Sequence, residues 1–335
     1  MRPVEIVGGG LAGLALGIAL RRHDVSVTIH EAGDYPRHRV CGEFITSLDR
    51  ETREVLGLNN ILGRALPASG VTWCEDGKTD IVHRLPQPAL CLSRHTLDGA
   101  MAATFADLGG NLRTGSRADC EDRPGRVLAC GRRPDTSSRW VGIKQHFRGL
   151  ELCNDLEVHF SPGGYIGITR VEAGTVNVCG LLRRGSCNLN TAFHDIAAQA
   201  GFGDLASRLN KAEAAADSFC AVAGLDYGKH VADDGCLRVG DRSALIPPFT
   251  GHGMTIALQS SVSVLPPLLA WSRGEIEWSH AKSDAAHRQR RRFGLRVGAA
   301  RTLHPILLDA RARRFARTLH RRGVLPVGLI YRVMH

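Results

Sequence analysis

Residues 4–31 read VEIVGGGLAGLALGIALRRHDVSVTIHE, and this stretch decides the fold. VEIVG is short and rich in β-branched residues, which is typical of a buried strand. LAGLALGIALRRH follows with apolar and small residues at helical spacing, and VSVTIHE reads as a second strand. A strand, a helix and a strand within 31 residues predict a βαβ unit and therefore a parallel sheet.

The glycines between the first strand and the helix form the pattern G-x-G-x-x-G at Gly8, Gly10 and Gly13. Gly8 permits a tight turn, Gly10 lets a pyrophosphate approach the backbone, and Gly13 lets the helix pack on the strand. The helix start, with Leu11 and Ala12, offers free N–H groups and a partial positive charge to phosphates. The pattern predicts a dinucleotide site.

Glu31 ends the second strand, 18 residues after Gly13. A carboxylate at this position accepts hydrogen bonds from a ribose diol and disfavours a 2′-phosphate, which leaves FAD or NAD for this site. The other interpretation is a glycine-rich turn followed by a surface glutamate.

The composition is that of an ordinary globular protein, with 43% apolar and 23% charged residues among 335. This length predicts two domains, or one large domain with an insertion. The ten cysteines form no CxxC pair, so neither a zinc site nor a disulfide scaffold is expected, and reduced thiols in the cytoplasm are the default. No stretch reaches the roughly 18 uninterrupted apolar residues of a membrane span.

The middle of the chain predicts a second, mostly antiparallel layer. VTWCEDGKTDIVH reads as a hairpin that turns at Asp76-Gly77, and LEVHFS, GYIGITRV and TVNVCGLL follow as strands before two helices. Ser47 is expected to cap a helix that runs to about Leu56, and Ser93 a helix that Gly109 ends. LRTG, RADCE and RVLACG resemble short strands. GCLRVGD, from Gly235, resembles a return to the first sheet, and helix is expected from Gly253 to about Arg322.

Four motifs in this order resemble the FAD-dependent geranylgeranyl reductase-like branch of the para-hydroxybenzoate hydroxylase superfamily, which includes the class A flavin monooxygenases. The motifs are VGGGLAGLALGIAL with Glu31, PRHRVCGEF (Pro36–Phe44), LSRHTLDGAM and VGDRSALIPPFTGHGMTIAL. The resemblance covers roughly residues 1–270. It implies an α/β fold with a Rossmann-like FAD-binding domain of the glutathione reductase type, an inserted antiparallel substrate domain and a C-terminal helical segment. The expected boundaries are 1–70, 90–140 and 230–280 for the FAD domain, 71–89 and 141–229 for the substrate domain, and 281–335 for the helices.

By that resemblance, Gly240 and Asp241 form a second flavin fingerprint, with the carboxylate on the ribityl chain. PPFTGHGM is the loop against the isoalloxazine ring, and it opens a helix whose N–H groups stabilise negative charge on the reduced ring. The cofactor contacts implied in this loop are those of Pro248, Gly251, Gly253 and Met254. The residues alone also allow a capped turn into a core helix.

PRHRVCGEF resembles the signature that follows the ribose-binding acid in the reductase branch. Arg37 is implied to touch phosphate or ribose, Cys41 and Gly42 to lie beside the flavin ring, and Arg94 to neighbour FAD at a helix start. Read without the resemblance, Cys41 is equally a buried filler and Arg94 a solvated helix residue. His252, inside the glycine loop, joins Cys41 as a candidate catalytic group, with an exposed loop histidine as its other interpretation.

Two departures bear on the chemistry. Cys130 stands before Gly131 where the superfamily has an Asp-Gly motif tied to pyridine-nucleotide contacts, so direct use of NADPH is less secure. The aromatic-proline pattern of archaeal geranylgeranyl reductases and the Trp-x-Trp-x-x-Pro pattern of flavin halogenases are both missing.

The reaction therefore stays open at this point. FAD reduced by NAD(P)H and used for hydroxylation of an aromatic or lipophilic small molecule is the first hypothesis, and reduction or oxidation of a C–C bond is the second. A redox-inert FAD-binding partner protein and an NAD-only dehydrogenase are weaker alternatives. Tyr165, Asn177 and Phe249 are the candidate substrate contacts, and no metal site is expected.

The net charge of +10 resides in the C-terminal segment, because residues 282–335 carry about 14 Lys and Arg against 2 Asp and Glu. Solvated surface helices explain this most simply, and an amphipathic contact with an anionic membrane also suits it. A nucleic-acid partner is not expected, because no recognition module is present.

Overall fold

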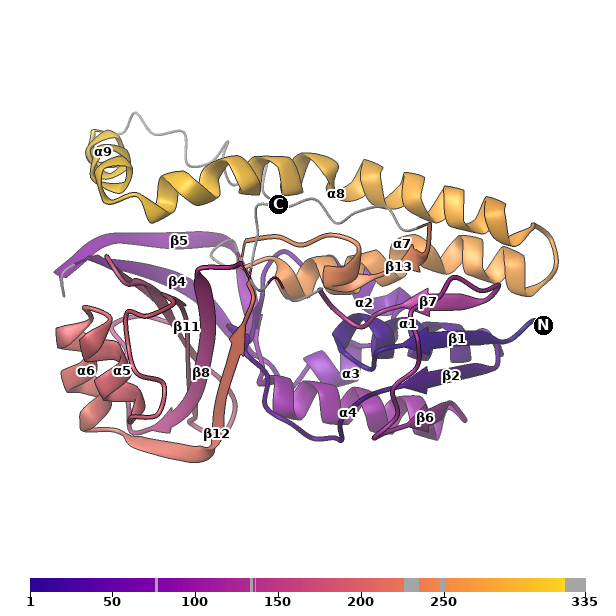
Figure 1. The fold of residues 1–335 in the computed structure, drawn as a ribbon, viewed down its shortest axis with the longest axis horizontal. Coiled ribbons are helices and arrows are strands. Elements are labelled where there is room, and N and C mark those ends of the chain that lie inside the picture. The colour runs from indigo at the N-terminus through magenta and orange to yellow at the C-terminus, as the bar shows by residue number, and fades with distance from the viewer. Residues whose placement is uncertain (76–77, 133–134, 136, 226–234, 248–250, 323–335) are drawn as a thin grey trace.

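The computed structural model describes residues 1–75, 78–132, 135, 137–225, 235–247 and 251–322. Two sheets lie side by side in this part of the chain, and long C-terminal helices run across both (Figure 1). The mixed α/β architecture with a Rossmann-like unit and a second sheet confirms the predicted fold class.

The first sheet is parallel and has the strand order β13-β7-β1-β2-β6. Strand β1 (Val4–Val7) pairs with β2 (Val27–His30) and β7 (Arg126–Leu128) in parallel, as the βαβ pattern predicts. The edges are β6 (Asn111–Arg113), beside β2, and β13 (Leu237–Arg238), beside β7. The return of the chain to this sheet near residue 237 is therefore confirmed.

Helices cover the parallel sheet. All ten residues from Leu11 to Leu20 of α1 (Leu11–Arg21) are buried. The helices packed against α1 are α4 (Arg94–Asp107) and α7 (Gly253–Ser272). The Ser93 hydroxyl accepts from the Thr96 N–H at 3.1 Å, so the predicted cap of α4 is confirmed.

The second sheet has the order β12-β8-β11-β10-β9-β4-β5-β3 and is antiparallel except where β4 and β9 pair in parallel. Its strands are β3 (Phe44–Ile45), β4 (Leu66–Glu75), β5 (Lys78–Cys91), β8 (Trp140–Arg148), β9 (Leu156–Ser161), β10 (Gly164–Arg170), β11 (Val176–Arg183) and β12 (Glu213–Ala223). One face packs on α5 (Phe193–Gln199) and α6 (Gly203–Asn210). On β8 this face carries Val141, Ile143 and Phe147, so the intervening residues point toward the first sheet.

The C-terminal helices are α8 (Trp278–Leu308) and α9 (Ala310–Arg321). Helix α8 packs along α7 and then extends over the second sheet, where α9 ends the described chain (Figure 1). Helix α7 is long and apolar enough to cross a membrane by composition, but 67% of its apolar window is buried between its neighbours. It is therefore a core helix of this fold.

Asp49, not Ser47, caps α2 (Arg50–Val55), because its carboxylate accepts from the Thr52 N–H at 2.6 Å. RADCE forms no strand: residues 117–121 pass the sheet edge without pairing. The β4–β5 hairpin is present, with Glu75 opposite Lys78, and its expected turn at residues 76–77 lies outside the described residues. Short helices α3 (Asn59–Leu62) and η1 (Gly240–Arg242) complete the elements.

Candidate active site

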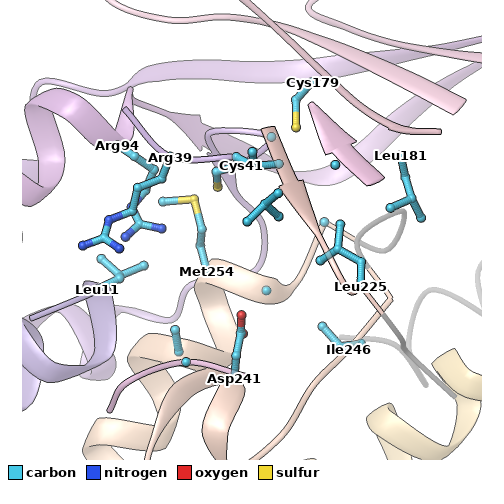
Figure 2. Close-up of a pocket in the computed structure, with 18 of the residues that line it drawn as sticks. Leu11, Arg39, Cys41, Arg94, Cys179, Leu181, Leu225, Asp241, Ile246 and Met254 are labelled. Atoms are coloured by element: carbon cyan, nitrogen blue, oxygen red, sulfur yellow. The ribbon is translucent and has the colours of Figure 1, made fainter. Parts of the chain in front are cut away.

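One large pocket lies between the two sheets, with a volume of about 1340 Å³. Ligand pockets are commonly 300–1,000 Å³, so this one has room for more than a drug-sized molecule. Its wall includes the glycine loop at one end and the aromatic residues of the second sheet at the other. Figure 2 shows its central part, where Leu11, Arg94, Asp241 and Met254 converge from four separate segments.

The glycine loop is shaped as a phosphate site requires. A Cβ added to Gly10 would meet nothing within 4 Å, so Gly10 faces open space in the pocket. A Cβ on Gly13 would lie 2.0 Å from the Gly8 carbonyl oxygen, so Gly13 serves the packing of α1 against β1. Gly8, Gly10, Leu11 and Ala12 line the pocket and Gly13 does not.

Glu31 lines the pocket beside this loop. Its carboxylate accepts from the Gly9 N–H at 2.8 Å and from the Gly33 N–H at 3.1 Å. Arg37 pairs with the same carboxylate at 2.5 Å. Arg37 therefore belongs to the end of the pocket where a ribose diol would meet Glu31.

Two further arginines meet at the middle of the pocket. Arg94 makes a bidentate pair with Asp98, both contacts being 2.7 Å, and Arg39 donates to the same carboxylate at 3.1 Å. Their guanidinium groups lie side by side above Leu11 (Figure 2). Burial alone would lower the pKa of Arg94, but the pairing with Asp98 outweighs it and raises the pKa. Arg39 is a residue that sequence reasoning missed, although it stands within the PRHRVCGEF motif.

The second fingerprint reaches the same pocket beside the start of α1, where a Cβ added to Gly240 would lie 3.0 Å from Ala12 Cβ. Asp241 points into it from η1, and the Gly240 N–H donates to the Ser260 hydroxyl of α7 at 2.8 Å. Asp241 lies deep in the molecule, where desolvation raises the pKa of its carboxyl. Gly251, Gly253 and Met254, at the start of α7, line the pocket beside it.

His252 also lines the pocket, but its side chain is buried with 1% exposure. The interpretation of a solvent-exposed loop histidine is therefore wrong. The Thr46 hydroxyl donates to the Gly251 carbonyl oxygen at 3.1 Å, which fixes this loop against β3. The sequence-predicted contacts Pro248 and Phe249 lie outside the described residues.

Cys41 and Gly42 form part of the wall across from α7. Desolvation raises the pKa of the Cys41 thiol even though Arg94 lies near it, so the sulfur stays protonated at neutral pH. The Asn177 side chain donates to the Cys41 carbonyl oxygen at 3.0 Å and does not itself line the pocket. Asn177 thus supports the wall, whereas Tyr165 lines the pocket directly.

The far end of the pocket is apolar and aromatic. Trp73 and Phe160 have ring centroids 5.5 Å apart, and Phe160 and Tyr165 follow at 6.4 Å. Arg313 of α9 lies over the Phe160 ring at 5.0 Å and pairs with Glu75 at 2.8 Å. The C-terminal segment therefore contributes to the pocket wall, which the sequence did not indicate.

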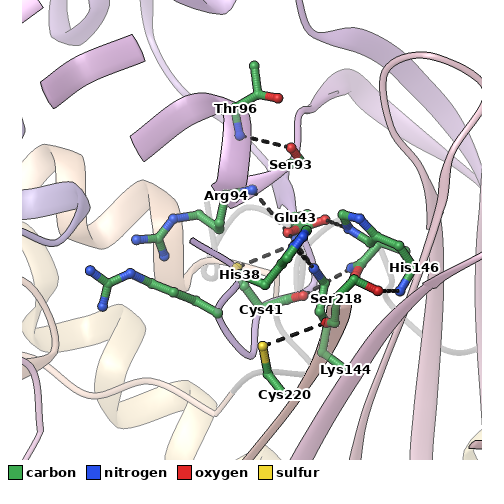
Figure 3. Close-up of polar contacts among 12 residues, drawn as sticks. His38, Cys41, Glu43, Ser93, Arg94, Thr96, Lys144, His146, Ser218 and Cys220 are labelled. Carbon is green, nitrogen blue, oxygen red and sulfur yellow. Dashed lines mark hydrogen bonds and ion pairs between the residues drawn. The ribbon is translucent and has the colours of Figure 1, made fainter. Parts of the chain in front are cut away.

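A buried polar cluster lies behind the wall at Cys41 (Figure 3). Its central members are His38, Glu43, Lys144 and His146. His38 and Glu43 belong to the PRHRVCGEF motif, in which they had no predicted role, and Lys144 and His146 belong to strand β8. The period-two pattern of WVGIKQHFR was the available signal, because Gly142, Lys144 and His146 alternate with a face that is apolar except for Gln145.

Comparison with known proteins agrees with this architecture. A sequence profile for the NAD(P)-binding Rossmann-like domain matches residues 6–43. No curated protein sequence matches the chain significantly.

Solved structures match almost the whole chain at low identity. The flavin-dependent brominase Bmp2 has a TM-score of 0.75 at 17% identity, covering 99% of this chain and 93% of its own. The p-nitrophenol 4-monooxygenase PnpA from Pseudomonas putida has a TM-score of 0.74 at 12% identity, covering 100% and 96%. A geranylgeranyl bacteriochlorophyll reductase-like protein from Thermoplasma acidophilum has a TM-score of 0.70 at 15% identity, covering 91% and 87%. The chain therefore has the fold of flavin-dependent monooxygenases and geranylgeranyl reductase-like proteins.

Proposed function

We propose that this chain is an FAD-dependent oxidoreductase that uses NAD(P)H to reduce its flavin and hydroxylates an aromatic or lipophilic small molecule. One observation carries the proposal. The G-x-G-x-x-G loop and the Gly240-Asp241 segment, roughly 230 residues apart in sequence, open onto the same pocket. A nicotinamide dehydrogenase that binds only NAD would have no use for the second segment.

The residues present fit FAD along its length. Glu31 would hold the adenosine ribose, and the open face of Gly10 with the start of α1 would receive the diphosphate. Arg39 and Arg94 add positive charge beside that position. Asp241 is a deep carboxylate whose desolvation cost is offset when it accepts hydrogen bonds from ribityl hydroxyls.

The chemistry divides between cofactor and protein. FAD supplies the redox reactivity when bound, whereas the chain supplies binding, orientation and exclusion of water. The N-terminus of α7 presents N–H groups to negative charge at the ring. Cys41, held as a neutral thiol, and Gly42 shape the opposite wall.

The lining of the far end supports the substrate class. Trp73, Phe160 and Tyr165 gather there, and the charge of Arg313 is matched by Glu75. An apolar and aromatic surface of this kind favours a neutral ring or hydrocarbon group.

Reduction or oxidation of a C–C bond is the second candidate. The motif around Cys41 and the fold likeness to a geranylgeranyl reductase-like protein favour it. The observations do not favour the redox-inert hypothesis, because the pocket is open at both fingerprints.

The proposal also places the protein in the cytoplasm, in peripheral contact with a membrane through its C-terminal helices. The exposed apolar side chains of the C-terminal helices, Leu295 at 86% and Phe315 at 66%, stand among arginines. Such a surface suits an anionic bilayer from which a lipophilic substrate would enter.

The flavin content of purified protein tests the proposal. We expect a yellow preparation absorbing near ~450 nm with one FAD per chain, bleached by NAD(P)H under anaerobic conditions. Reoxidation by O2 that yields hydroxylated phenol supports a monooxygenase, whereas reoxidation by a polyprenyl compound without O2 supports a reductase. Colourless protein that does not take up FAD on reconstitution would overturn both.

A further inference from the structure

The cluster behind the Cys41 wall holds charged groups that the proposed function leaves without a role. Lys144 and Glu43 both have 0% side-chain exposure, and Lys144 Nζ lies 3.4 Å from Glu43 Oε1. Burying an ammonium and a carboxylate costs several kcal/mol per ion unless each is well paired. This buried pair lies beside the pocket of about 1340 Å³, where charged groups held at such a cost commonly serve a function.

Glu43 is the centre of the cluster. Its Oε2 lies 2.6 Å from His146 Nε2, and its Oε1 accepts from the Arg94 N–H at 3.0 Å, at the start of α4. Its backbone has φ of +59°, a left-handed conformation that costs energy for a residue other than glycine. Holding the Glu43 carboxylate next to Lys144 and His146 therefore costs free energy, both as backbone strain and as desolvation of the charged groups.

The sheet register directs Lys144 toward the pocket. Lys144 stands opposite Cys179 of β11 and Cys220 of β12, and both cysteines line the pocket. Gly142 and His146 share this face of β8, whereas Ile143 and Phe147 pack into the core on the other face.

His38 connects Lys144 to the pocket. It lines the pocket, and its Nδ1 lies 2.9 Å from Lys144 Nζ (Figure 3). Burial, followed by the charge of Lys144, lowers the pKa of His38 to about 4, so the ring is neutral at physiological pH. An ammonium can only donate, so Nδ1 accepts and the ring proton lies on Nε2. The His38 ring also stacks on His95 at 4.6 Å and meets His146 edge-on at 4.9 Å.

We propose that His38, Lys144, Glu43 and His146 form a proton relay that delivers a proton to the molecule reacting in the pocket. The proposal rests on the proposed function, since it names the proton path of that same site. A neutral imidazole suits this role, because it can gain a proton at one nitrogen while it releases another from the second.

The step balances without any change in oxidation state. The His38 Nε2–H bond breaks as the proton passes to the pocket molecule, and a Lys144 Nζ–H bond breaks as a bond forms to His38 Nδ1. Lys144 is left as a neutral amine, and His38 stays neutral in its other tautomer. Glu43 then takes a proton from His146 Nε2 and passes it to Lys144 Nζ, and His146 is reprotonated by hydronium from the solvent, so the net change is one solvent proton moved to the pocket molecule.

The charged and titratable groups around Lys144 and its partners His38 and Glu43 come from several adjoining elements. They are His38 and Glu43 of the loop before β3, Arg94 and His95 of α4, His146 of β8, Cys179 of β11 and Cys220 of β12. Removing Lys144 deletes the cation that faces His38, so the titration of His38 must respond.

The first test reads the imidazole itself and needs no flavin chemistry. In 15N-histidine NMR spectra, the signal that His38→Gln removes identifies His38. We expect a neutral ring with the proton on Nε2 from pH 5.5 to 8, and in Lys144→Met a pKa moved up toward the ordinary value of about 6.5. Lys211→Met, at an exposed lysine, is the matched control and should leave the signal unchanged. An unchanged His38 titration in Lys144→Met would overturn the proposal.

The second test reads turnover in preparations of equal FAD content. We expect Lys144→Met and His38→Gln to lower the rate of the proton-dependent step roughly 10²-fold, with a changed pH profile. His38 is partly exposed, so His38→Gln keeps the test decisive should Lys144→Met fail to fold. Yellow variants with wild-type pH profiles would refute the relay alone, whereas colourless wild-type protein would refute the proposed function.

Discussion

At the scale of single residues, burial shifts the pKa values of several side chains that line the pocket. Asp241 has a raised pKa because desolvation disfavours its charged form. Its folded-state pKa therefore exceeds the unfolded value of 3.8, so the apo protein loses stability as pH rises through that folded pKa. The buried Asp241 carboxyl therefore lowers the stability of the apo protein at neutral pH, as expected for a residue whose position serves ligand binding.

Asp241→Asn should therefore have opposite effects on the apo and FAD-bound protein. Without FAD, the variant should be more stable than wild type at pH 8, with the gain vanishing near pH 3. With FAD, occupancy should fall, because a carboxylate acceptor is lost. Thermal melts across pH and flavin-to-protein absorbance ratios measure the two effects. Asp217→Asn, at an exposed position, is the control, and full FAD occupancy in Asp241→Asn would contradict the assignment.

The second prediction at this scale concerns Cys41. Because desolvation raises its thiol pKa, we expect slow alkylation by iodoacetamide at pH 7.5 compared with the exposed Cys153. Peptide mass spectrometry measures both rates in one sample. Alkylation of Cys41 as fast as that of Cys153 would contradict the raised thiol pKa.

We also expect Cys41→Ala to change turnover or flavin potential more than FAD occupancy.

At the scale of elements, the β1–α1 turn separates a residue that serves the ligand from one that serves the fold. Gly10→Ala should fold normally, with apo stability within about 0.5 kcal/mol of wild type, because its Cβ meets open space. It should still lose FAD, since that space is where a diphosphate approaches the backbone.

Gly13→Ala is the matched comparison, because its Cβ would lie 2.0 Å from the Gly8 carbonyl. We expect it to lower the melting temperature strongly before any question of binding arises. Circular dichroism melts and FAD titrations of both variants make the comparison. Normal FAD binding by Gly10→Ala would place the diphosphate elsewhere.

The features that could be predicted from sequence are those that depend on residues close together in the chain. The βαβ unit and the cap at Ser93 are written in adjacent residues, and they were predictable. The sequence predicts the cap of α2 two residues too early, at Ser47, because Ser and Asp are both good caps. The relay is not visible in the sequence because residues 38 and 43, in the loop before β3, meet residues 144 and 146 of β8 only through tertiary packing, which no local pattern specifies.

At the scale of the whole molecule, polar contacts beyond the pocket join the second sheet to helix α4, which covers the first sheet. Glu172, between β10 and β11, accepts from the Ser93 N–H at 2.9 Å and from the hydroxyls of Ser93 and Thr96 at the start of α4. Burial alone would raise the pKa of Glu172, but these hydrogen bonds outweigh it and lower the pKa. The stabilisation is therefore present at neutral pH and is lost as pH falls through the folded pKa.

Glu172→Gln should accordingly destabilise the protein by roughly 1–3 kcal/mol at pH 7 and by much less near pH 3. Urea unfolding at both pH values measures the difference. Glu213→Gln, at an exposed position on β12, serves as control. An equal loss at both pH values would show that the contact acts by packing and not by charge.

The burial of α1 has a consequence for synthesis on the ribosome. Helix α1 is among the first elements translated, yet its partner α7 begins roughly 240 residues later. At about 5–20 residues per second, the side of α1 that α7 covers stays exposed for roughly ten to fifty seconds, although α4 is made much earlier. Efficient production of this protein should therefore depend on a chaperone that shelters this side of α1 until just over three-quarters of the polypeptide is made.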